Sequence, residues 1–199
     1  LRGGHSYGGT YTNNIAVYAI QGARVEFSGQ GDGSSLEVTA TNVLDPGTDP
    51  FYGNIALFAR DGMILADYQN GADIVLNGGL ASFASNEDSQ VRISALEGSS
   101  TVINGKFMAV GSQDAIGGIT IDTAGQTTIT APFIMSQSGT VSIDIGSESL
   151  NGSEYGIRSS LQALYGDADD GPSIINVHLA GDKNVFTGFS YRGADEAYN

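Results

Sequence analysis

The amino-acid sequence repeats a short apolar motif at nearly regular steps. The motif Ile55-Ala-Leu-Phe-Ala-Arg60 is similar to Ile15-Ala-Val-Tyr-Ala-Ile20, and both follow an Asn and precede a Gly within two residues. Comparable openings occur at Ala81, Phe107 and Phe133, so three successive steps are 26 residues each (81−55, 107−81 and 133−107). Such a period indicates repeated units that cannot bury their apolar faces alone and must stack on their neighbours.

Short runs in which apolar and polar residues alternate fill each period and indicate β-strands. In the unit that starts at Ile55 we count three runs, over residues 55–60, 63–68 and 72–77. The sequence therefore predicts an all-β, parallel β-helix (a solenoid) with about three short strands per coil, each hydrogen-bonded to its equivalent one coil away. A β-sandwich also has short alternating strands, but it would not repeat at near-equal steps.

The alternation also predicts which side chains face the core. The aliphatic residues that share one face of the clearest runs are Ile119, Ile121, Val141, Ile143, Val177 and Leu179. We expect all of them to point inward. A register error of one residue would turn every one of them outward.

Aromatic residues recur near the start of several units. We expect Tyr18, Phe58 and Phe83 to occupy equivalent positions in successive coils, and the residues that follow, Phe107, Phe133 and Tyr155, to lie near the same place. Stacked inside the coils they would be core. On the outside they would form a ladder for recognition of sugar or protein.

Two insertions interrupt the period, and no linker divides the chain. The excess residues lie in 42–53 and 164–173, and insertions in solenoids map to external loops that often carry function. We interpret residues 1–199 as a single β-helix segment and as part of a longer surface protein. Residues 1–12 are Gly-rich and are interpreted as either a partial coil or a disordered end.

Composition excludes several classes of partner. The net charge is −14, and only eight Lys and Arg residues are present, whereas nucleic acids and anionic membranes are bound through basic residues. No run approaches the roughly 20 apolar residues of a membrane helix, so we expect no direct membrane insertion. The chain has no Cys, which excludes disulfides and thiolate metal sites.

Several motifs resemble one family of bacterial surface proteins. They are Asn54-Ile-Ala-Leu-Phe-Ala59, Gly117-Gly-Ile-Thr-Ile-Asp122 and Gly139-Thr-Val-Ser-Ile-Asp-Ile-Gly146. The pattern is similar to that of autotransporter passenger domains and related β-helical adhesins, over roughly residues 13–190. The resemblance implies a right-handed β-helix displayed outside an outer membrane. It also implies a secreted or cell-surface location and a non-catalytic structural or adhesive role, of the kind associated with virulence.

Three closely spaced carboxylates are the strongest chemical candidates. Asp167, Asp169 and Asp170 precede Gly171 and could gather oxygen ligands for Ca²⁺. The Glu that would complete an EF-hand loop is missing, so a solvated acidic turn is the other interpretation. We expect no other cofactor.

Two alternatives to an adhesive role stay open. One is a polysaccharide-acting β-helix enzyme, pectin lyase-like or hydrolase-like, and the other is a phage tail-fibre segment. Glycoside hydrolysis needs two carboxylates at a defined separation. Pectate-lyase chemistry needs a basic residue beside a Ca²⁺ ion that carboxylates hold. No Arg or Lys lies between Arg158 and Lys183. We therefore expect no enzymatic activity.

The two insertions supply the candidate recognition residues. Each combines carboxylates with aromatic side chains, and the candidates are Asp45, Asp49, Phe51, Tyr52 and Tyr165. The expected partner is a host-cell or matrix protein, a glycan, or a second copy of the chain.

Overall fold

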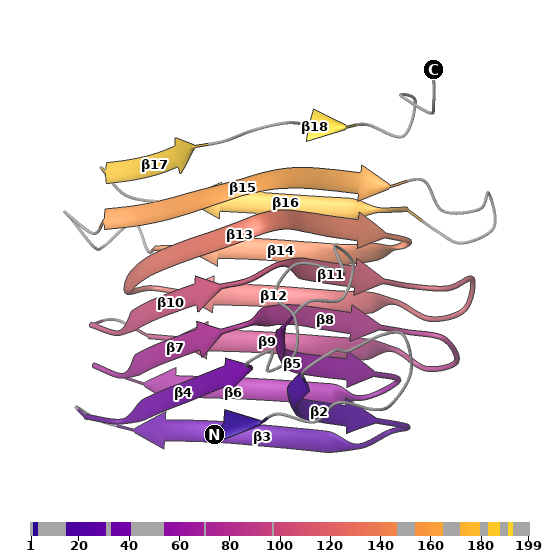
Figure 1. The fold of residues 1–199 in the computed structure, drawn as a ribbon, viewed down its shortest axis with the longest axis horizontal. Coiled ribbons are helices and arrows are strands. Elements are labelled where there is room, and N and C mark those ends of the chain that lie inside the picture. Colours follow the sequence, from indigo (N-terminus) through magenta and orange to yellow (C-terminus); the bar gives the residue numbers. More distant parts are fainter. Residues whose placement is uncertain are drawn as a thin grey trace.

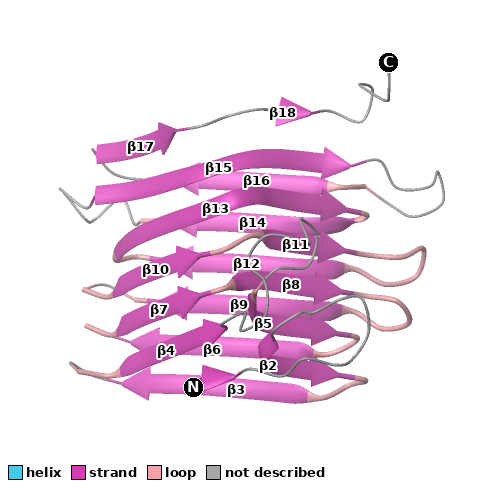
Figure 2. Cartoon of the chain, viewed as in Figure 1, coloured by secondary structure: helices cyan, strands magenta, loops and turns pink. Residues whose placement is uncertain are grey.

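The computed structural model describes ten stretches of the chain. They are residues 2–3, 15–30, 33–40, 54–69, 71–96, 98–146, 154–164, 172–179, 183–187 and 191–192. In these stretches the regular elements are strands, and Figure 2 shows no helix among them. The expectation of an all-β chain is confirmed for this part of the molecule.

Each complete coil consists of three successive strands. The unit that begins at Ile55 contains β5 (Ile55–Arg60), β6 (Met63–Gln69) and β7 (Asp73–Asn77), close to the predicted runs. The strands before it are β1 (Arg2–Gly3), β2 (Ile15–Ile20), β3 (Arg24–Gln30) and β4 (Ser35–Ala40). The strands after it are β8 (Gly79–Phe83), β9 (Ser89–Ala95), β10 (Ser100–Asn104), β11 (Phe107–Val110), β12 (Gly117–Thr123), β13 (Gln126–Gln137), β14 (Gly139–Ile145), β15 (Glu154–Leu164), β16 (Ile174–Leu179), β17 (Lys183–Thr187) and β18 (Tyr191–Arg192).

The strands stack in two parallel sheets. One has six strands in the order β16-β14-β12-β9-β6-β3. The other has twelve: nine follow the path β1-β4-β7-β10-β13-β11-β8-β5-β2, and β15, which pairs with β13, adds β17 and β18. The long strand β13 joins two stacks of strands into this one sheet, because its first half pairs with β10 and its second half with β11. Figure 1 shows β10 and β11 running in one direction and β12 running back. This arrangement of stacked parallel strands is compatible with a β-helix.

The stacking register differs from the predicted 26-residue step. The first equivalence is correct, since Ile15 is in register with Ile55. Beyond it, Leu57 is in register with Leu80, Leu80 with Phe107, and Phe107 with Ile134, which are steps of 23, 27 and 27 residues (80−57, 107−80 and 134−107). The pairing of β5 with β8 is irregular between Ile55 and Leu57, and this irregularity shifts the register of the two strands. The buried apolar side chains that stack from coil to coil set the register. The first residues of the repeated sequence motif do not.

The predicted equivalence of the aromatic residues is confirmed for Tyr18 and Phe58 and is wrong for Phe83. Tyr18 is in register with Phe58, but Phe58 is in register with Ala81 on its other side. Phe83 lies two positions further along its strand, and Phe107 is buried in the core row. The remaining two do not continue the ladder either: Phe133 is in register with Ser160, and Tyr155 with Thr127 and Asn184. Phe107 is therefore in the core, whereas Tyr18, Phe58 and Phe83 lie on the outer side of their strands.

The main core lies between the two sheets and contains the predicted inward residues. Ile119, Ile121, Val141 and Ile143 are at most 1% exposed, which confirms their predicted orientation. Val177 and Leu179 are partly buried and pack against the same core. Identical or similar residues meet across coils, as where Ile121 lies in register with Ile93 and Ile143.

Polar side chains and glycines stack at one corner of the coils. The Asn104 side-chain amide donates to Asn77 Oδ1 at 3.0 Å, and Asn77 donates to Thr39 Oγ1 at 3.4 Å. Next to this ladder, a Cβ atom on Gly105 would lie 2.3 Å from the carbonyl carbon of Gly78. Neighbouring backbones approach so closely here that a side chain has no room.

Candidate functional site

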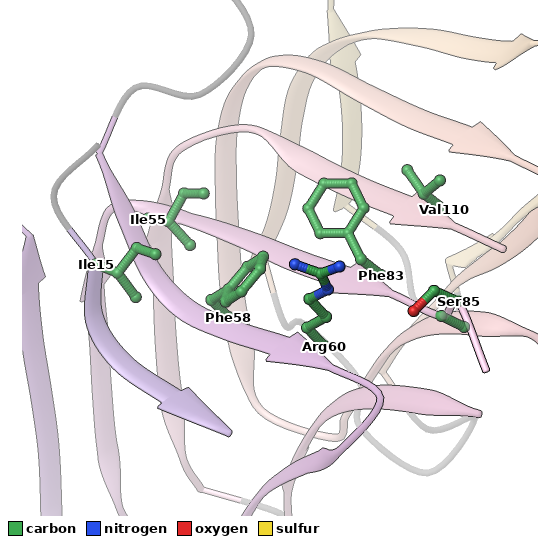
Figure 3. Close-up of a pocket in the computed structure, with 8 residues that line it drawn as sticks. Ile15, Ile55, Phe58, Arg60, Phe83, Ser85 and Val110 are labelled. Atoms are coloured by element: carbon green, nitrogen blue, oxygen red, sulfur yellow. The ribbon is translucent and has the colours of Figure 1, made fainter. Parts of the chain in front are cut away.

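An apolar hollow lies on the outer side of β2, β5, β8 and β11. Its volume is about 360 Å³, and Figure 3 shows the side chains that line it. The described lining residues are Ile15, Ile55, Phe58, Arg60, Phe83, Ala84, Ser85 and Val110. Six of these eight are apolar, so the hollow can hold an apolar group.

The hollow exists because these strands carry apolar residues on both faces. On β8, Leu80 belongs to the main core while Ala81 belongs to a second apolar cluster. On β11, Phe107 faces the main core and Met108 belongs to the second cluster. Strands that are apolar on both faces are typical of parallel sheets that are covered on both sides. The members of the second cluster are at most 5% exposed, whereas the partly buried Phe58, Phe83 and Val110 beside them can contact another apolar group.

Two phenylalanines form one wall of the hollow. The ring centroids of Phe58 and Phe83 are 5.5 Å apart, and the ring planes are tilted by 53°. Such tilted pairs stabilise each other by about 0.5–1.5 kcal/mol beyond the area that they bury. Both rings are half-buried, so each keeps one surface open to the hollow.

Arg60 is the one charged residue among the described residues that line the hollow. It is exposed and lies in register with Phe83 on the neighbouring strand. Figure 3 shows its guanidinium on the same side as the two phenylalanine rings. The site therefore combines an apolar wall with a single positive charge.

Asp61 holds the turn that forms the rim beside Ser85. Its carboxylate accepts hydrogen bonds from the Ser85 hydroxyl and the Ser85 backbone N–H, both at 2.6 Å. It also accepts from the backbone N–H groups of Asn86 at 3.0 Å and Glu87 at 3.3 Å. Asp61 is only 7% exposed and adopts a positive φ of 48°. This residue fixes the rim through four hydrogen bonds, and its backbone strain is the cost of that position.

These hydrogen bonds make the stability of the protein depend on acid pH. The bond from the Ser85 side chain, followed by those from the backbone, lowers the pKa of Asp61 well below its ordinary value of 3.8. A carboxylate with a lowered pKa stabilises the folded state above the unfolded pKa, and this contribution is lost as the pH falls through the folded pKa. We expect the free energy of unfolding to decline as the pH drops below about 4.

The variant Asp61→Asn tests this contribution. It should lower the free energy of unfolding at neutral pH by about 2 kcal/mol, because charge-assisted hydrogen bonds are lost. It should also flatten the acid part of the pH profile, measured by urea unfolding at a series of pH values. The same acid slope in Asp61→Asn and in the wild type would show that other carboxylates cause it.

The sequence-predicted site residues lie outside the described part of the chain. This holds for the Ca²⁺ candidates Asp167, Asp169 and Asp170, and for the recognition candidates Asp45, Asp49, Phe51, Tyr52 and Tyr165. Among the described residues, no cluster of three or more His, Cys, Asp or Glu side chains could hold a metal ion. The exposed pair of His178 Nδ1 and Asp144 Oδ1, 2.9 Å apart, is too small a set for such a site.

Sequence reasoning missed the hollow, although a signal was present. In Ile55-Ala-Leu-Phe-Ala-Arg60 and in Phe107-Met-Ala-Val110 the apolar residues are consecutive and do not alternate. Consecutive apolar residues in a short strand indicate burial on both faces. That signal could have predicted an apolar outer surface on this row of strands.

Comparisons with protein-family models, with curated proteins and with solved structures found no match to this chain. The described stretches contain no helix of the length and apolarity needed to cross a membrane.

Proposed function

We propose that the chain is a non-catalytic, adhesive and structural segment of a bacterial secreted or surface-displayed protein of the autotransporter type. The observation that supports this role is the apolar outer face of the parallel stack. This face continues from the hollow to Tyr18 and Ile20, which are 59% and 42% exposed. A stiff stack with exposed apolar side chains at this edge, Tyr18 and Ile20, can hold a binding surface away from a cell.

The stack is proposed to be a right-handed β-helix. Each coil leaves one sheet, passes through the other and returns to pair in parallel with the strand where it started, as β5 does with β8. Crossover connections between parallel strands of one sheet are right-handed in about 98% of cases. The six strands of one sheet, at about 4.8 Å spacing, give a length on the order of 24 Å.

The proposed partner is a host-cell or matrix protein outside the bacterium. Tyr18 and Ile20 lie in register with Phe58 and Arg60, so aromatic, aliphatic and guanidinium groups form one surface. Tyr and Arg are enriched among the residues that dominate protein–protein binding. This composition favours a protein partner for this face over a glycan, which would need more polar groups.

The absence of catalysis is part of the same proposal. Among the described residues that line the hollow, Arg60 and Ser85 are the polar ones, and no carboxylate is present. The Ser85 hydroxyl already donates a hydrogen bond to the Asp61 carboxylate. Glycosidase chemistry needs a pair of carboxylates facing the substrate, and this lining offers none.

Adhesion can be tested with the double variant Tyr18→Ser/Ile20→Ser. Binding of the purified chain to cultured host cells and to immobilised matrix proteins should fall about tenfold or more, because exposed apolar anchors carry much of such binding. The control Leu96→Ser removes an apolar side chain that is 46% exposed and follows β9. Equal binding by the double variant and the wild type would contradict the role of this face, and no binding by the wild type would contradict adhesion.

A further inference from the structure

We infer that the hollow binds a small amphipathic monocarboxylate, such as a free medium-chain fatty acid. The apolar body would lie against Phe58 and Phe83, and the carboxylate would pair with Arg60. This inference goes beyond adhesion and does not depend on it, because it concerns the hollow itself and a soluble ligand.

The size and lining of the hollow fit a small apolar molecule. Its volume of about 360 Å³ is at the low end of the range for small-molecule sites. Its walls are aliphatic and aromatic, from Ile15 and Ile55 on one side to Phe83 and Val110 on the other. Such walls favour transfer of an alkyl or aryl group out of water.

The charge at the rim selects an acid. Arg60 is one of only eight basic residues in a chain with a net charge of −14, so an anion is repelled over most of the molecule. Within the described residues Arg60 makes no ion pair, because the salt bridges found there join other groups. A guanidinium matches a carboxylate with two parallel hydrogen bonds. A cationic ligand would be repelled at the same place.

The scarcity of polar groups argues against a sugar. A polyhydroxylated ligand needs many hydrogen-bond partners, and each buried polar group without one costs free energy. The Ser85 hydroxyl and its backbone N–H both donate to Asp61, so neither is available as a donor to a ligand. A ligand with one carboxylate on an apolar body needs only the polar contacts that Arg60 can supply.

The test compares octanoate with octanol, which share the alkyl chain and differ in charge. Isothermal titration calorimetry of the wild-type chain should show octanoate binding about tenfold or more tightly than octanol, as expected for a charge-assisted contact. The variant Arg60→Gln should lose this preference and bind both with similar, weak affinity. The matched control Arg92→Gln removes an exposed arginine from β9 in the other sheet and should keep the preference.

Several outcomes would overturn the inference. These are no measurable octanoate binding, equal binding of the two probes to the wild type, or an unchanged preference in Arg60→Gln. If Arg92→Gln also lost the preference for octanoate, the preference would come from the net charge of the protein and not from Arg60, and the inference would be overturned. The variant Tyr18→Ser/Ile20→Ser should still bind octanoate, so a failure of the adhesive role and a failure of this inference are distinguishable.

Discussion

The variant Ile121→Asp is expected to unfold the coils around β12. Ile121 is fully buried and lies in register with Ile93 and Ile143, so the new carboxylate would sit between two apolar side chains. An unpaired charge in such a place costs about 4 kcal/mol or more, which is a large part of the stability of a typical domain. Urea unfolding followed by circular dichroism should show a large loss of stability or no folded protein.

The neighbouring residue provides a matched control. Thr120 is on the opposite face of the same strand and lies in register with the exposed Arg92. The same charge introduced as Thr120→Asp should therefore change stability by less than about 0.5 kcal/mol. If Thr120→Asp unfolds the protein and Ile121→Asp does not, the inward and outward faces of β12 have been exchanged.

The second large effect is expected at a glycine between coils. The variant Gly105→Ala would place its Cβ 2.3 Å from the Gly78 carbonyl carbon and 2.3 Å from the Gly79 nitrogen. Both are backbone atoms of the coil below, so the stack must open to make room. We expect a loss of about 3 kcal/mol, measured by urea unfolding.

A glycine in an open position serves as the control for this substitution. In Gly118→Ala the nearest atom to the new Cβ would be the Ser89 carbonyl oxygen at 3.7 Å, an ordinary contact. Its effect should lie within about 0.5 kcal/mol of zero, or be slightly stabilising because the unfolded chain loses freedom. Similar losses in both variants would show that close backbone approach is not what requires Gly105.

The strands were predictable from local pattern, whereas their stacking register was not. Alternation in the run from Ile119 to Ile121 identifies an inward face, because only one side of that strand meets the core. The register of β5 on β8 depends on which buried side chains stack on one another, as Leu57 and Leu80 do. The register is set by contacts between segments that are far apart in the sequence. The irregular pairing shifts the register, and no residue pattern near it in the sequence indicates the shift.

The candidate site was harder to predict because it is built from several coils. Arg60 and Phe83 become neighbours only through the pairing of β5 with β8. Asp61 and Ser85 meet across the same step, and nothing near either residue in the sequence indicates that the carboxylate will accept four hydrogen bonds. By contrast, sequence reasoning selected acidic and aromatic residues that are close together along the chain, and these lie outside the described residues.

A disulfide between coils tests most directly whether the strands form a parallel stack with a fixed register. The natural chain has no Cys, so the pair Thr120→Cys/Ser142→Cys introduces the only two thiols. These positions are in register on β12 and β14, where the Cα spacing of about 4.8 Å suits a disulfide. We expect rapid oxidation of this pair to an intramolecular disulfide, and little for Thr120→Cys/Asp144→Cys, which is displaced by two residues. If the displaced pair forms the bond and the in-register pair does not, the stack described here is wrong.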